Sequence, residues 1–466
     1  MKRPCVQVPP IRKEDGTWAR NEQEKAEIYA RHLERVFLPN AIDSELDIVL
    51  CPQLSTTRKK IKNVTPLEVV KVIDDSLNPK KAPGYDEISP KILKELPKKA
   101  IIHLTHIYNA ILRMEYIPEQ WKRAQVIMLL KPGKPPEDVT SYRQISLLPK
   151  KHLIPDHQFG FRNKHSTIDQ VHRVTNVISK ALEEKDYCCG VFLDVDQAFD
   201  KVWHKGFLIK LREQLPHTWC ALLESYLTDR QFRVIHEEAV TEWKNISAGV
   251  PQGSVLGPIL YLLYTADIPN NDNNDTITIA MFADDTAILS TSKNQLTATD
   301  NLQASINNIF AWTRRWKIKI NGDKSVHVNY TLRKTENIPI LLNQTLIPQK
   351  DSAKYLGMHL DSRLNWKHHV RQKKIQIKEK MRKLYWLIGP HSELTIENKR
   401  LLYVAIIKLI WTYGIQLWGC VTEEIQKFAR KHERRLEDHI NPMATELLDN
   451  SKDIRRLKRL KPYDLV

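Results

Sequence analysis

The sequence lacks the cysteine patterns and long hydrophobic runs that mark several classes of protein. Its six cysteines form no CxxC pair, show no histidine spacing that would suit zinc, and follow no recognisable secretory leader. The run from Val255 to Tyr264 is shorter than the roughly 20 residues of a bilayer span, and the run from Leu401 to Trp411 is interrupted by Lys408. We therefore expect an intracellular protein in a reducing compartment, with no membrane partner.

What the sequence does have is a globular composition with an excess of positive charge. A chain of 466 residues has room for about three average domains. Hydrophobic residues make up 42% of it and charged residues 27%, as in soluble globular proteins. The 72 Lys and Arg against 55 Asp and Glu give a net charge of +17, which favours a polyanionic partner through counterion release. A basic protein without such a partner is the alternative on charge alone.

Local patterns predict a mixed α+β chain. Residues 1–57 surround a helix-like stretch from Asn21 to Phe37 and are interpreted as a linker or appended segment. From Val64 the chain is a mixture of amphipathic helices and short β-branched strands, separated by Pro/Gly-containing segments. After Tyr355 the pattern is mostly helical, and one apolar stripe at helical periodicity contains Trp366, Val370, Ile377, Met381, Leu384 and Ile388. The basic residues on the other faces of that helix suit either a nucleic-acid backbone or simple solvation.

Three carboxylates are the strongest chemical signal. Residues 191–193 form a short β-prone run that brings Asp194 to a strand end. Residues 276–282 alternate with period two, and a second strand resumes at Thr286, so Asp284 and Asp285 belong to a hairpin tip. Adjacent carboxylates repel unless cations lie between them, which predicts hard divalent ions, best Mg²⁺ with Mn²⁺ as a substitute. If the strands pair, two ions about 3.5 to 4 Å apart would support phosphoryl transfer. A polar turn is the alternative for an isolated Asp-Asp pair.

The order of several sequence blocks resembles the reverse transcriptases of non-LTR retrotransposons, particularly jockey-like mobile elements, over roughly residues 60–420. The seven blocks, in the order of the family, are NPKKAPGYD (78–86), SYRQIS (141–146), QFGFR (158–162) with Ser166-Thr167, the Asp194 block, GVPQGSVLGP (249–258), FADD (282–285) and KYLG (354–357).

This resemblance implies an RNA-directed DNA polymerase with a right-hand fold. It implies a linker or appended segment at 1–57, fingers at 58–185, a palm with an antiparallel sheet at 186–345, a primer-positioning turn and helical thumb at 346–420, and a basic segment at 421–466. The implied partners are an RNA template, a DNA primer or target and dNTPs. The implied locations are the nucleus and a cytoplasmic ribonucleoprotein, and the oligomeric state stays open.

The resemblance also assigns roles to single residues. Asp194, Asp284 and Asp285 match the metal-binding carboxylates, whereas Asp196 and Asp200 match positions that are not ligands. Phe199 matches the bulky residue that walls the sugar pocket and selects deoxynucleotides, and a core phenylalanine is the alternative. The remaining matches are Arg143, Gln252 and Gly253 at the incoming nucleotide, the catalytic Lys324 near the triphosphate, and Tyr355, Leu356 and Gly357 at the primer and template.

Each of these further matches has a structural alternative. Arg143 would otherwise be a surface arginine, and Gln252-Gly253 a loop before a helix that Pro258 begins. Lys324 would be a hairpin-turn lysine after Asn321-Gly322. Thr167 to Gln170 has capping-box spacing, so this stretch is predicted to start a helix.

The sequence departs from the family pattern at two junctions. A helical stretch of the fingers is missing between Pro149 and Lys150, and a thumb segment is missing near Cys420. We expect no endonuclease domain before residue 60 and, because no separate acidic cluster is present, no ribonuclease H domain. These losses leave a second hypothesis, a catalytically inactive remnant that binds nucleic acid through its basic helices. A nucleotidyl cyclase with a palm-like core is a third, against which the fingers blocks and Phe199 argue.

Overall fold

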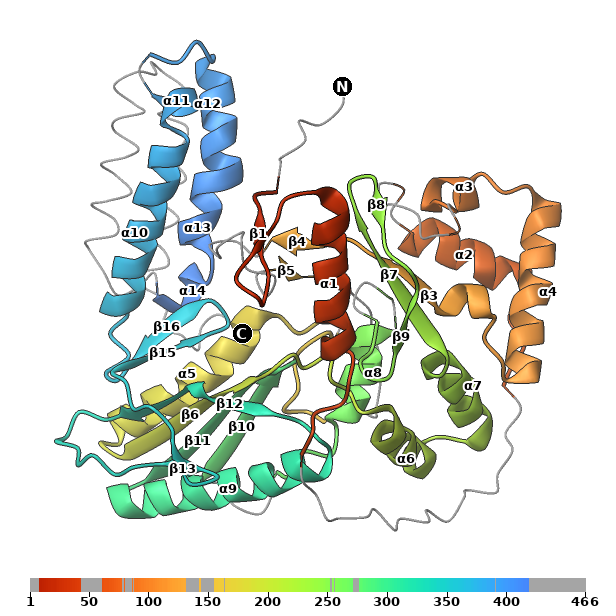
Figure 1. The fold of residues 1–466 in the computed structure, drawn as a ribbon. Helices are drawn as coiled ribbons and strands as arrows, with labels where there is room; N and C mark the ends of the chain where they lie inside the picture. The colour runs from red at the N-terminus through yellow and green to blue at the C-terminus, as the bar shows by residue number, and fades with distance from the viewer. Residues whose placement is uncertain are drawn as a thin grey trace. The chain divides into compact units, whose positions relative to one another are not determined.

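The chain is a mixture of helices and strands, as the sequence predicted (Figure 1). The computed structural model describes residues 8–42, 61–77, 79, 86, 88–130, 142–143, 155–162, 164–251, 254, 256–270, 276–389 and 391–418. The chain forms two compact units, each built from segments that are far apart in sequence. Unit 1 comprises Met1–Lys164, Val195–Pro269 and Asn307–Asn321, and unit 2 comprises His165–Asp194, Asn270–Ile306 and Gly322–Val466.

Unit 1 contains a small mixed sheet with helices around it. Its strands are β3 (Arg123–Val126), parallel to β7 (Arg230–His236), and β8 (Ala239–Val240) and β9 (Lys244–Ile246), both antiparallel to β7. Two further strand pairs are β1 (Ile11–Arg12) with β2 (Trp18–Ala19), and β4 (Leu129–Leu130) with β5 (Tyr142–Arg143). The helices are α1 (Glu22–Val36), α2 (Pro66–Ser76), α3 (Pro90–Lys94), α4 (Lys98–Met114), η1 (Glu119–Lys122), α6 (His204–Gln214), α7 (His217–Leu227) and α8 (Gly257–Tyr264).

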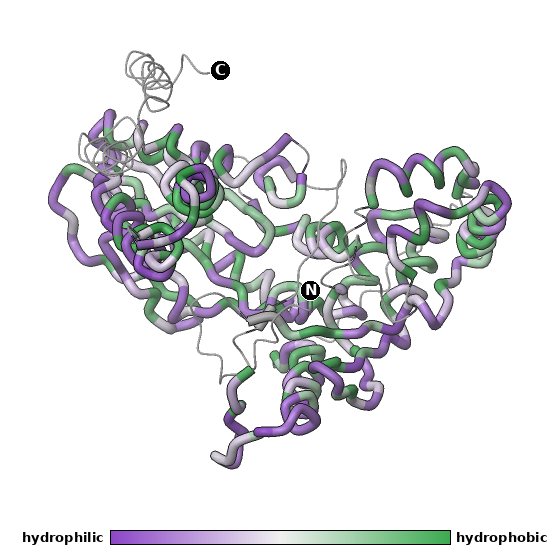
Figure 2. The backbone as a smooth tube through the Cα atoms, turned by 90° about the horizontal axis from the view of Figure 1, so that it is seen from above, coloured by the Kyte–Doolittle hydropathy of each residue, from purple (hydrophilic) through white to green (hydrophobic). Residues whose placement is uncertain are grey.

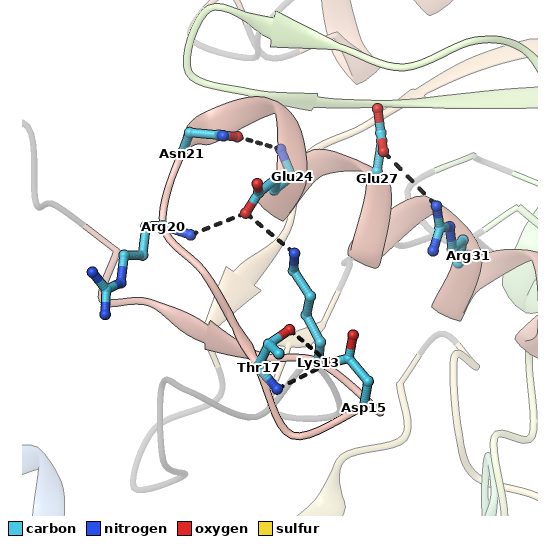
Figure 3. A network of polar contacts seen from close by, with 8 residues as sticks. All are labelled: Lys13, Asp15, Thr17, Arg20, Asn21, Glu24, Glu27 and Arg31. Carbon is cyan, nitrogen blue, oxygen red and sulfur yellow. Dashed lines mark hydrogen bonds and ion pairs between the residues drawn. The ribbon is translucent and has the colours of Figure 1, made fainter.

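Helix α1 begins where side chains satisfy its first backbone donors. The Asn21 carboxamide accepts a hydrogen bond from the Glu24 N–H at 2.7 Å. The Glu24 carboxylate accepts from the Arg20 N–H at 3.4 Å and pairs with Lys13 at 3.4 Å (Figure 3). The helix expected between Asn21 and Phe37 is therefore confirmed, with these two residues as its caps.

The N-terminal segment is part of the core of unit 1. Tyr29, Leu33 and Val36 of α1 pack with Phe232 and Val234 of β7. The rings of Phe37 and Phe232 meet edge to face, with centroids 5.1 Å apart. The sequence indicated a linker or appended segment here, and it held no sign that α1 would cover a strand some 200 residues later.

A buried lysine lies among aromatic rings elsewhere in unit 1. The Lys210 side chain is only 2% exposed and lies over the rings of Trp316, Trp312 and Tyr264, with its Nζ 3.9, 4.8 and 4.9 Å from their centroids. Its Nζ donates to the Tyr264 carbonyl at 2.6 Å and pairs with Asp267, whose side chain is 38% exposed. Burial lowers the pKa of Lys210 to about 8, against the opposing effect of Asp267.

This depressed pKa makes the free energy of unfolding rise with pH. Between about pH 8 and 10.5 the unfolded chain holds the Lys210 proton that the folded chain has lost, so the wild type gains up to roughly 3 kcal/mol over that interval. Lys210→Met removes the gain, so it should be neutral or stabilising at pH 7 and become progressively destabilising relative to wild type by pH 10.5. Urea unfolding at several pH values measures this, and a difference that does not change with pH would contradict it.

Unit 2 is built on a four-stranded antiparallel sheet in the order β10-β11-β6-β12. Its strands are β10 (Ile277–Phe282), β11 (Asp285–Ser292), β6 (Tyr187–Val195) and β12 (Ile320–Tyr330). Helix α5 (Thr167–Glu183) covers one face through Val171, Val174 and Ile178. The Cys189 thiol contacts the Thr299 hydroxyl of helix α9 (Gln295–Arg315) at 3.6 Å, so α9 lies against the other face.

The rest of unit 2 begins with short strands and becomes helical. The strands are β13 (Leu341–Leu342), β14 (Thr345–Leu346), β15 (Ser352–Tyr355) and β16 (Met358–Asp361). The helices are α10 (Lys367–Lys383), α11 (Tyr385–Ile388), α12 (Ile396–Leu402), η3 (Tyr403–Lys408), α13 (Leu409–Thr412) and α14 (Ile415–Trp418). Of the predicted apolar stripe, Trp366, Val370 and Ile377 are buried. Hydrophilic and hydrophobic stretches alternate over short distances (Figure 2), and no helix in the described part of the chain is long and apolar enough to cross a membrane.

Candidate active site

Asp194 and Asp285 lie at the same end of two neighbouring strands of the unit 2 sheet. Strands β6 and β11 pair antiparallel with Leu193 opposite Thr286, and the next positions in the same register are Asp194 and Asp285. Directly opposite residues of an antiparallel pair project to the same face, with Cβ atoms roughly 5 Å apart. The predicted site required the Asp194 strand to pair with the hairpin, and this pairing is confirmed.

Asp284 and Asp285 lie at a tight turn between β10 and β11. Strand β10 ends at Phe282 and β11 begins at Asp285, so Ala283 and Asp284 form a two-residue hairpin turn. Ala283 has φ 58°, a conformation that costs a residue with a Cβ atom about 1 kcal/mol or more. The predicted hairpin with two acids at its tip is confirmed, and its backbone strain lies next to the proposed chemistry.

Lys324 approaches the carboxylates from the opposite side. It lies on β12, which pairs with β6 on the edge away from β11. Its Nζ is 3.6 Å from the Asp194 Oδ2, and the Asp194 N–H donates to the Ser325 hydroxyl at 3.2 Å. Asn321 and Gly322 lie within β12, so the alternative interpretation of Lys324 as a hairpin-turn lysine is wrong. Pairing with the central strand overrides the local turn propensity of Asn-Gly.

A divalent cation fits the chemistry of this group. Carboxylates at the same end of adjacent strands repel each other, and a hard cation offsets that repulsion because it prefers oxygen ligands. Asp194 is 44% exposed and Asp285 is exposed, so both are accessible to an ion from solvent. Among the described residues, no three His, Cys, Asp or Glu side chains lie close enough to hold a metal ion together. The fold brings the carboxylates to one end of the sheet without gathering all three around one point.

Tyr355 lies directly behind the hairpin. Its hydroxyl donates to the Ala280 carbonyl of β10 at 3.1 Å, and its ring contacts Phe192 of β6 at 5.5 Å. Burial and the charge of Asp285 raise the pKa of this phenol, so it stays a hydrogen-bond donor. With 2% exposure, the side chain of Tyr355 supports the sheet from within and is not available at the surface.

The following residues form a second tight turn, which Tyr413 holds. Leu356 and Gly357 connect β15 and β16, with φ values of 44° and 81°. The Tyr413 hydroxyl donates to the Leu356 carbonyl at 2.8 Å and lies 2.9 Å from the Thr167 hydroxyl at the start of α5. Tyr413 therefore links this turn to the helix that covers the carboxylate sheet, a contact that no motif in the sequence indicated.

Phe199 belongs to an aromatic stack in unit 1. Its ring lies parallel to Tyr261 of α8 at 4.3 Å and edge to face with Phe161 at 6.0 Å. Phe199 is only partly buried, at the edge of a core cluster that includes Tyr261. The stack fixes the plane of the ring while leaving part of it exposed. It joins three separate blocks of the sequence, the Phe161, Phe199 and Tyr261 segments.

The loop before α8 is hydrogen-bonded to the Phe199 segment. The Val250 N–H donates to the Phe199 carbonyl and the Gly249 N–H to the Val202 carbonyl, each at 2.8 Å. A His204 ring nitrogen lies 2.7 Å from the Gly249 carbonyl, and burial lowers the pKa of that imidazole. Gly249 has φ 92°, and a Cβ atom there would lie 2.7 Å from the Asp200 carbonyl oxygen. Only glycine permits this approach.

Gly249→Ala should therefore destabilise the protein by more than the φ penalty alone. Gly16→Ala is a matched control, because Gly16 has φ 84° and a Cβ atom added there would meet no other atom within 4 Å, so it should cost only about 1 kcal/mol. Gly249→Ala adds a backbone collision and should cost roughly 2 to 3 kcal/mol. Urea denaturation of the two variants tests the difference. Equal losses would show that the contact with Asp200 is not restrictive.

Several predicted residues lie partly or wholly outside the described ranges. Arg143 lies on β5, but its side chain is not described, and Gln252 and Gly253 fall outside, as do the Pro149–Lys150 junction and Cys420. Pro258 lies at the start of α8, as predicted. Helix α5 does have a capping box, but it is formed by Ser166 and Asp169, so the predicted box of Thr167 and Gln170 is wrong by one residue.

Comparison with known proteins was consistent with the sequence blocks. The model of the family described as "Reverse transcriptase (RNA-dependent DNA polymerase)" matches residues 137–360. The chain is 36% identical over 531 residues to the "Probable RNA-directed DNA polymerase from transposon X-element" of Drosophila melanogaster, an alignment covering 100% of this chain and 58% of that protein. It is 39% identical over 452 residues to the corresponding protein "from transposon BS" of the same species, covering 90% and 49%.

A third relative and one solved structure also resemble this chain. The "RNA-directed DNA polymerase from mobile element jockey" of Drosophila melanogaster is 33% identical over 534 residues, covering 98% of this chain and 58% of that protein. The chain thus spans between 49% and 58% of the length of these three relatives. A structure of apo telomerase from Candida tropicalis is 12% identical and covers 44% of this chain and 39% of that one, with a TM-score of 0.34, which is too low to establish a common fold.

Proposed function

Because this chain belongs to the reverse transcriptase (RNA-dependent DNA polymerase) family, we propose that it is the polymerase segment of a jockey-like non-LTR retrotransposon protein. In this proposal it copies an RNA template into DNA by adding dNTPs to a primer 3′-OH. The observation that carries it is the placement of Asp194 and Asp285 at the same end of two paired antiparallel strands, with Lys324 beside Asp194. The names of the relatives, RNA-directed DNA polymerases of transposons and mobile elements, support the same reaction.

The proposed architecture is a right hand. Fingers would occupy residues 58–185, a palm 186–345 and a thumb with its preceding turn 346–420, between an N-terminal segment at 1–57 and a basic segment at 421–466. Two observations support this division. The carboxylate strands β6, β10 and β11 fall inside the proposed palm, and the consecutive helices α10 to α14 fall inside the proposed thumb.

The carboxylates would hold the catalytic metal. Enzymes of this family typically use a divalent metal, and Asp194, Asp284 and Asp285 are the residues that would bind two Mg²⁺ ions, with Mn²⁺ as a substitute. Bound there, the ions would supply a lowered pKa for the primer hydroxyl and neutralisation of the pyrophosphate charge. Tyr355 would act as a positioning residue, because its hydrogen bond to Ala280 fixes the strand that leads into the carboxylate turn.

Other residues would bind and orient the nucleotide. Lys324, 63% exposed and 3.6 Å from Asp194, would donate a proton to the departing pyrophosphate. Phe199 would close the pocket beside C2′ of the sugar, and Arg143, Gln252 and Gly253 would contact the triphosphate and base. Leu356 and Gly357, in the turn held by Tyr413, would lie along the primer strand.

Primer extension tests the proposal directly. The purified chain, given a DNA primer annealed to an RNA template with dNTPs and Mg²⁺, should extend the primer to the template end. A DNA template of the same sequence and a reaction with EDTA serve as controls. Absence of any extension, from protein shown to be folded, would contradict the polymerase assignment.

A second candidate function is an inactive remnant that binds nucleic acid. One observation favours it. The alignment with the X-element protein is 531 residues long, whereas this chain has 466 residues. The relative therefore has segments that have no counterpart in this chain. The remnant would bind RNA in a salt-sensitive manner and incorporate no nucleotide. The extension assay separates the two candidates, since any template-directed product excludes the remnant.

A further inference from the structure

The unit 1 sheet has two chemically different faces. Val126, Phe232 and Val234 point to the face that helix α1 covers, and they pack in one core cluster. Lys244 also points to that side, where it pairs with Glu34 of α1. Because successive residues of a strand alternate between faces, the residues between these positions belong to the opposite face.

The opposite face carries a cluster of polar and aromatic side chains, and Ile235 of β7 lies beside it on the same face. Arg123 of β3 pairs with Gln231 of β7, which in turn pairs with Asn245 of β9, and the Gln231 amide donates to Asn245 at 3.3 Å. In the neighbouring row, Gln125 of β3 pairs with Arg233 of β7. Arg123 and Asn245 are exposed and the others are half-buried, so this face is in contact with solvent.

Trp243 joins the two arginines of this face. It precedes β9, and its ring lies under the guanidinium carbons of Arg233 at 4.7 Å and of Arg123 at 5.6 Å. A guanidinium held over an indole loses little conformational freedom when it binds an anion, and its donors remain available at the edge of the stack. We call the surface formed by these side chains the Arg-Trp face; it consists of Arg123, Gln125, Gln231, Arg233, Trp243 and Asn245.

We propose that the Arg-Trp face binds single-stranded RNA. Two fixed guanidinium groups would bind successive phosphates, and the amides of Gln125, Gln231 and Asn245 would donate and accept at the bases and at the ribose 2′-OH. An open sheet face with aromatic, basic and amide side chains is a general solution for binding unpaired RNA, whereas a duplex would require contacts across a groove. None of the six residues of the face is a carboxylate, and the net charge of +17 favours the same ligand. The inference rests on the proposed function in its choice of RNA as the natural ligand.

Binding measured without catalysis tests this surface independently of polymerisation. The full chain, in EDTA and without dNTPs, is titrated into a fluorescein-labelled oligouridine at several salt concentrations. The double variant Arg123→Gln/Arg233→Gln should weaken binding on the order of tenfold, and should make the slope of log K against log salt shallower by about 1.4, for two lost phosphate contacts. The matched control Arg20→Gln/Arg31→Gln removes the same charge from two exposed arginines, one just before α1 and one within it. It should change neither the affinity nor the salt slope appreciably.

Crosslinking of the wild-type chain keeps the test valid if the double variant folds poorly. RNA containing 4-thiouridine should crosslink to the peptide that contains Trp243 when it is irradiated in the complex. An unchanged affinity and salt slope in the folded double variant, crosslinks confined to other peptides, or tighter binding of the corresponding DNA oligonucleotide would each overturn the proposal. A lack of primer extension would not affect the proposal, because RNA binding and crosslinking are measured without dNTPs or metal.

Discussion

Asp285→Asn is expected to lower the rate of primer extension on the order of 10³-fold while leaving the protein folded. Asparagine keeps the size of the side chain but removes the negative charge that a divalent cation would require. Asp285 is exposed at the first position of β11, so the sheet should tolerate a side chain of the same size there. Single-turnover extension with saturating dNTP measures the effect on chemistry separately from binding.

Asp196→Asn is the matched control for that experiment. Asp196 follows Asp194 by two residues, and its carboxylate accepts a hydrogen bond from the Asn321 amide at 3.1 Å. Asp196 matches a position of the family that is not a metal ligand, so extension by this variant should stay within a few-fold of wild type. Equal losses in the two variants would mean that negative charge in the region, and not Asp285 as a ligand, sustains the reaction.

Phe199→Val is expected to reduce the preference for dNTP over rNTP by about a hundredfold. The ring stacks on Tyr261 at 4.3 Å and meets Phe161 at 6.0 Å, so its position is set and it cannot turn aside for a ribose 2′-OH. Valine would leave space where the ring ends. The ratio of kcat/KM for dNTP to that for rNTP is the quantity to compare.

Phe207→Leu is the control that separates an effect of the Phe199 ring on sugar selection from an effect of destabilising the same core. Phe207 is fully buried in the cluster that Phe199 borders, and its ring meets Tyr264 at 5.6 Å. Its replacement should lower the free energy of unfolding by roughly 1 to 2 kcal/mol without altering sugar preference. If Phe207→Leu relaxed the selection as strongly as Phe199→Val, the proposed role of Phe199 would be excluded.

The parts of the fold that the sequence predicted well are those with a strong local cause. The hairpin around Asp284 follows from a period-two segment, a polar turn and a second β-prone segment. The first strand and the start of the second lie within one residue of the expected positions. The end of β6 near Asp194 and the caps of α1 at Asn21 and Phe37 are equally local. In each case a few consecutive residues determine the structure.

One prediction and one alternative interpretation were wrong because distant contacts decided between competing local signals. Ser166 and Thr167 both begin a sequence with capping-box spacing, but Gln170 is buried and donates its amide to the Met281 carbonyl of β10 at 2.9 Å. It is therefore unavailable to cap α5, and Asp169 does so instead. For the Asn-Gly pair before Lys324, the partner strand β6 made extended backbone more favourable than a turn.

Other features had no sequence signal at all. The packing of α1 on β7 joins segments some 200 residues apart, and periodicity reveals that α1 has an apolar face without revealing its partner. Tyr413 belongs to no recognisable motif, although its hydroxyl donates a hydrogen bond to the Leu356 carbonyl in the turn between β15 and β16. Gly249 was noticed only as part of a block, and the reason for glycine, an approach to the Asp200 carbonyl, required coordinates.

The length of the turn between β10 and β11 restricts how this protein can vary in evolution. With only Ala283 and Asp284 between the strands, the pairing register fixes which side chains of β11 share a face with Asp194. One inserted residue would move β11 by one position and turn the Asp285 side chain to the other face of the sheet, unless a bulge absorbed it. Insertions and deletions at this hairpin should therefore be as damaging as substitution of its acids, although they would leave every carboxylate in the sequence.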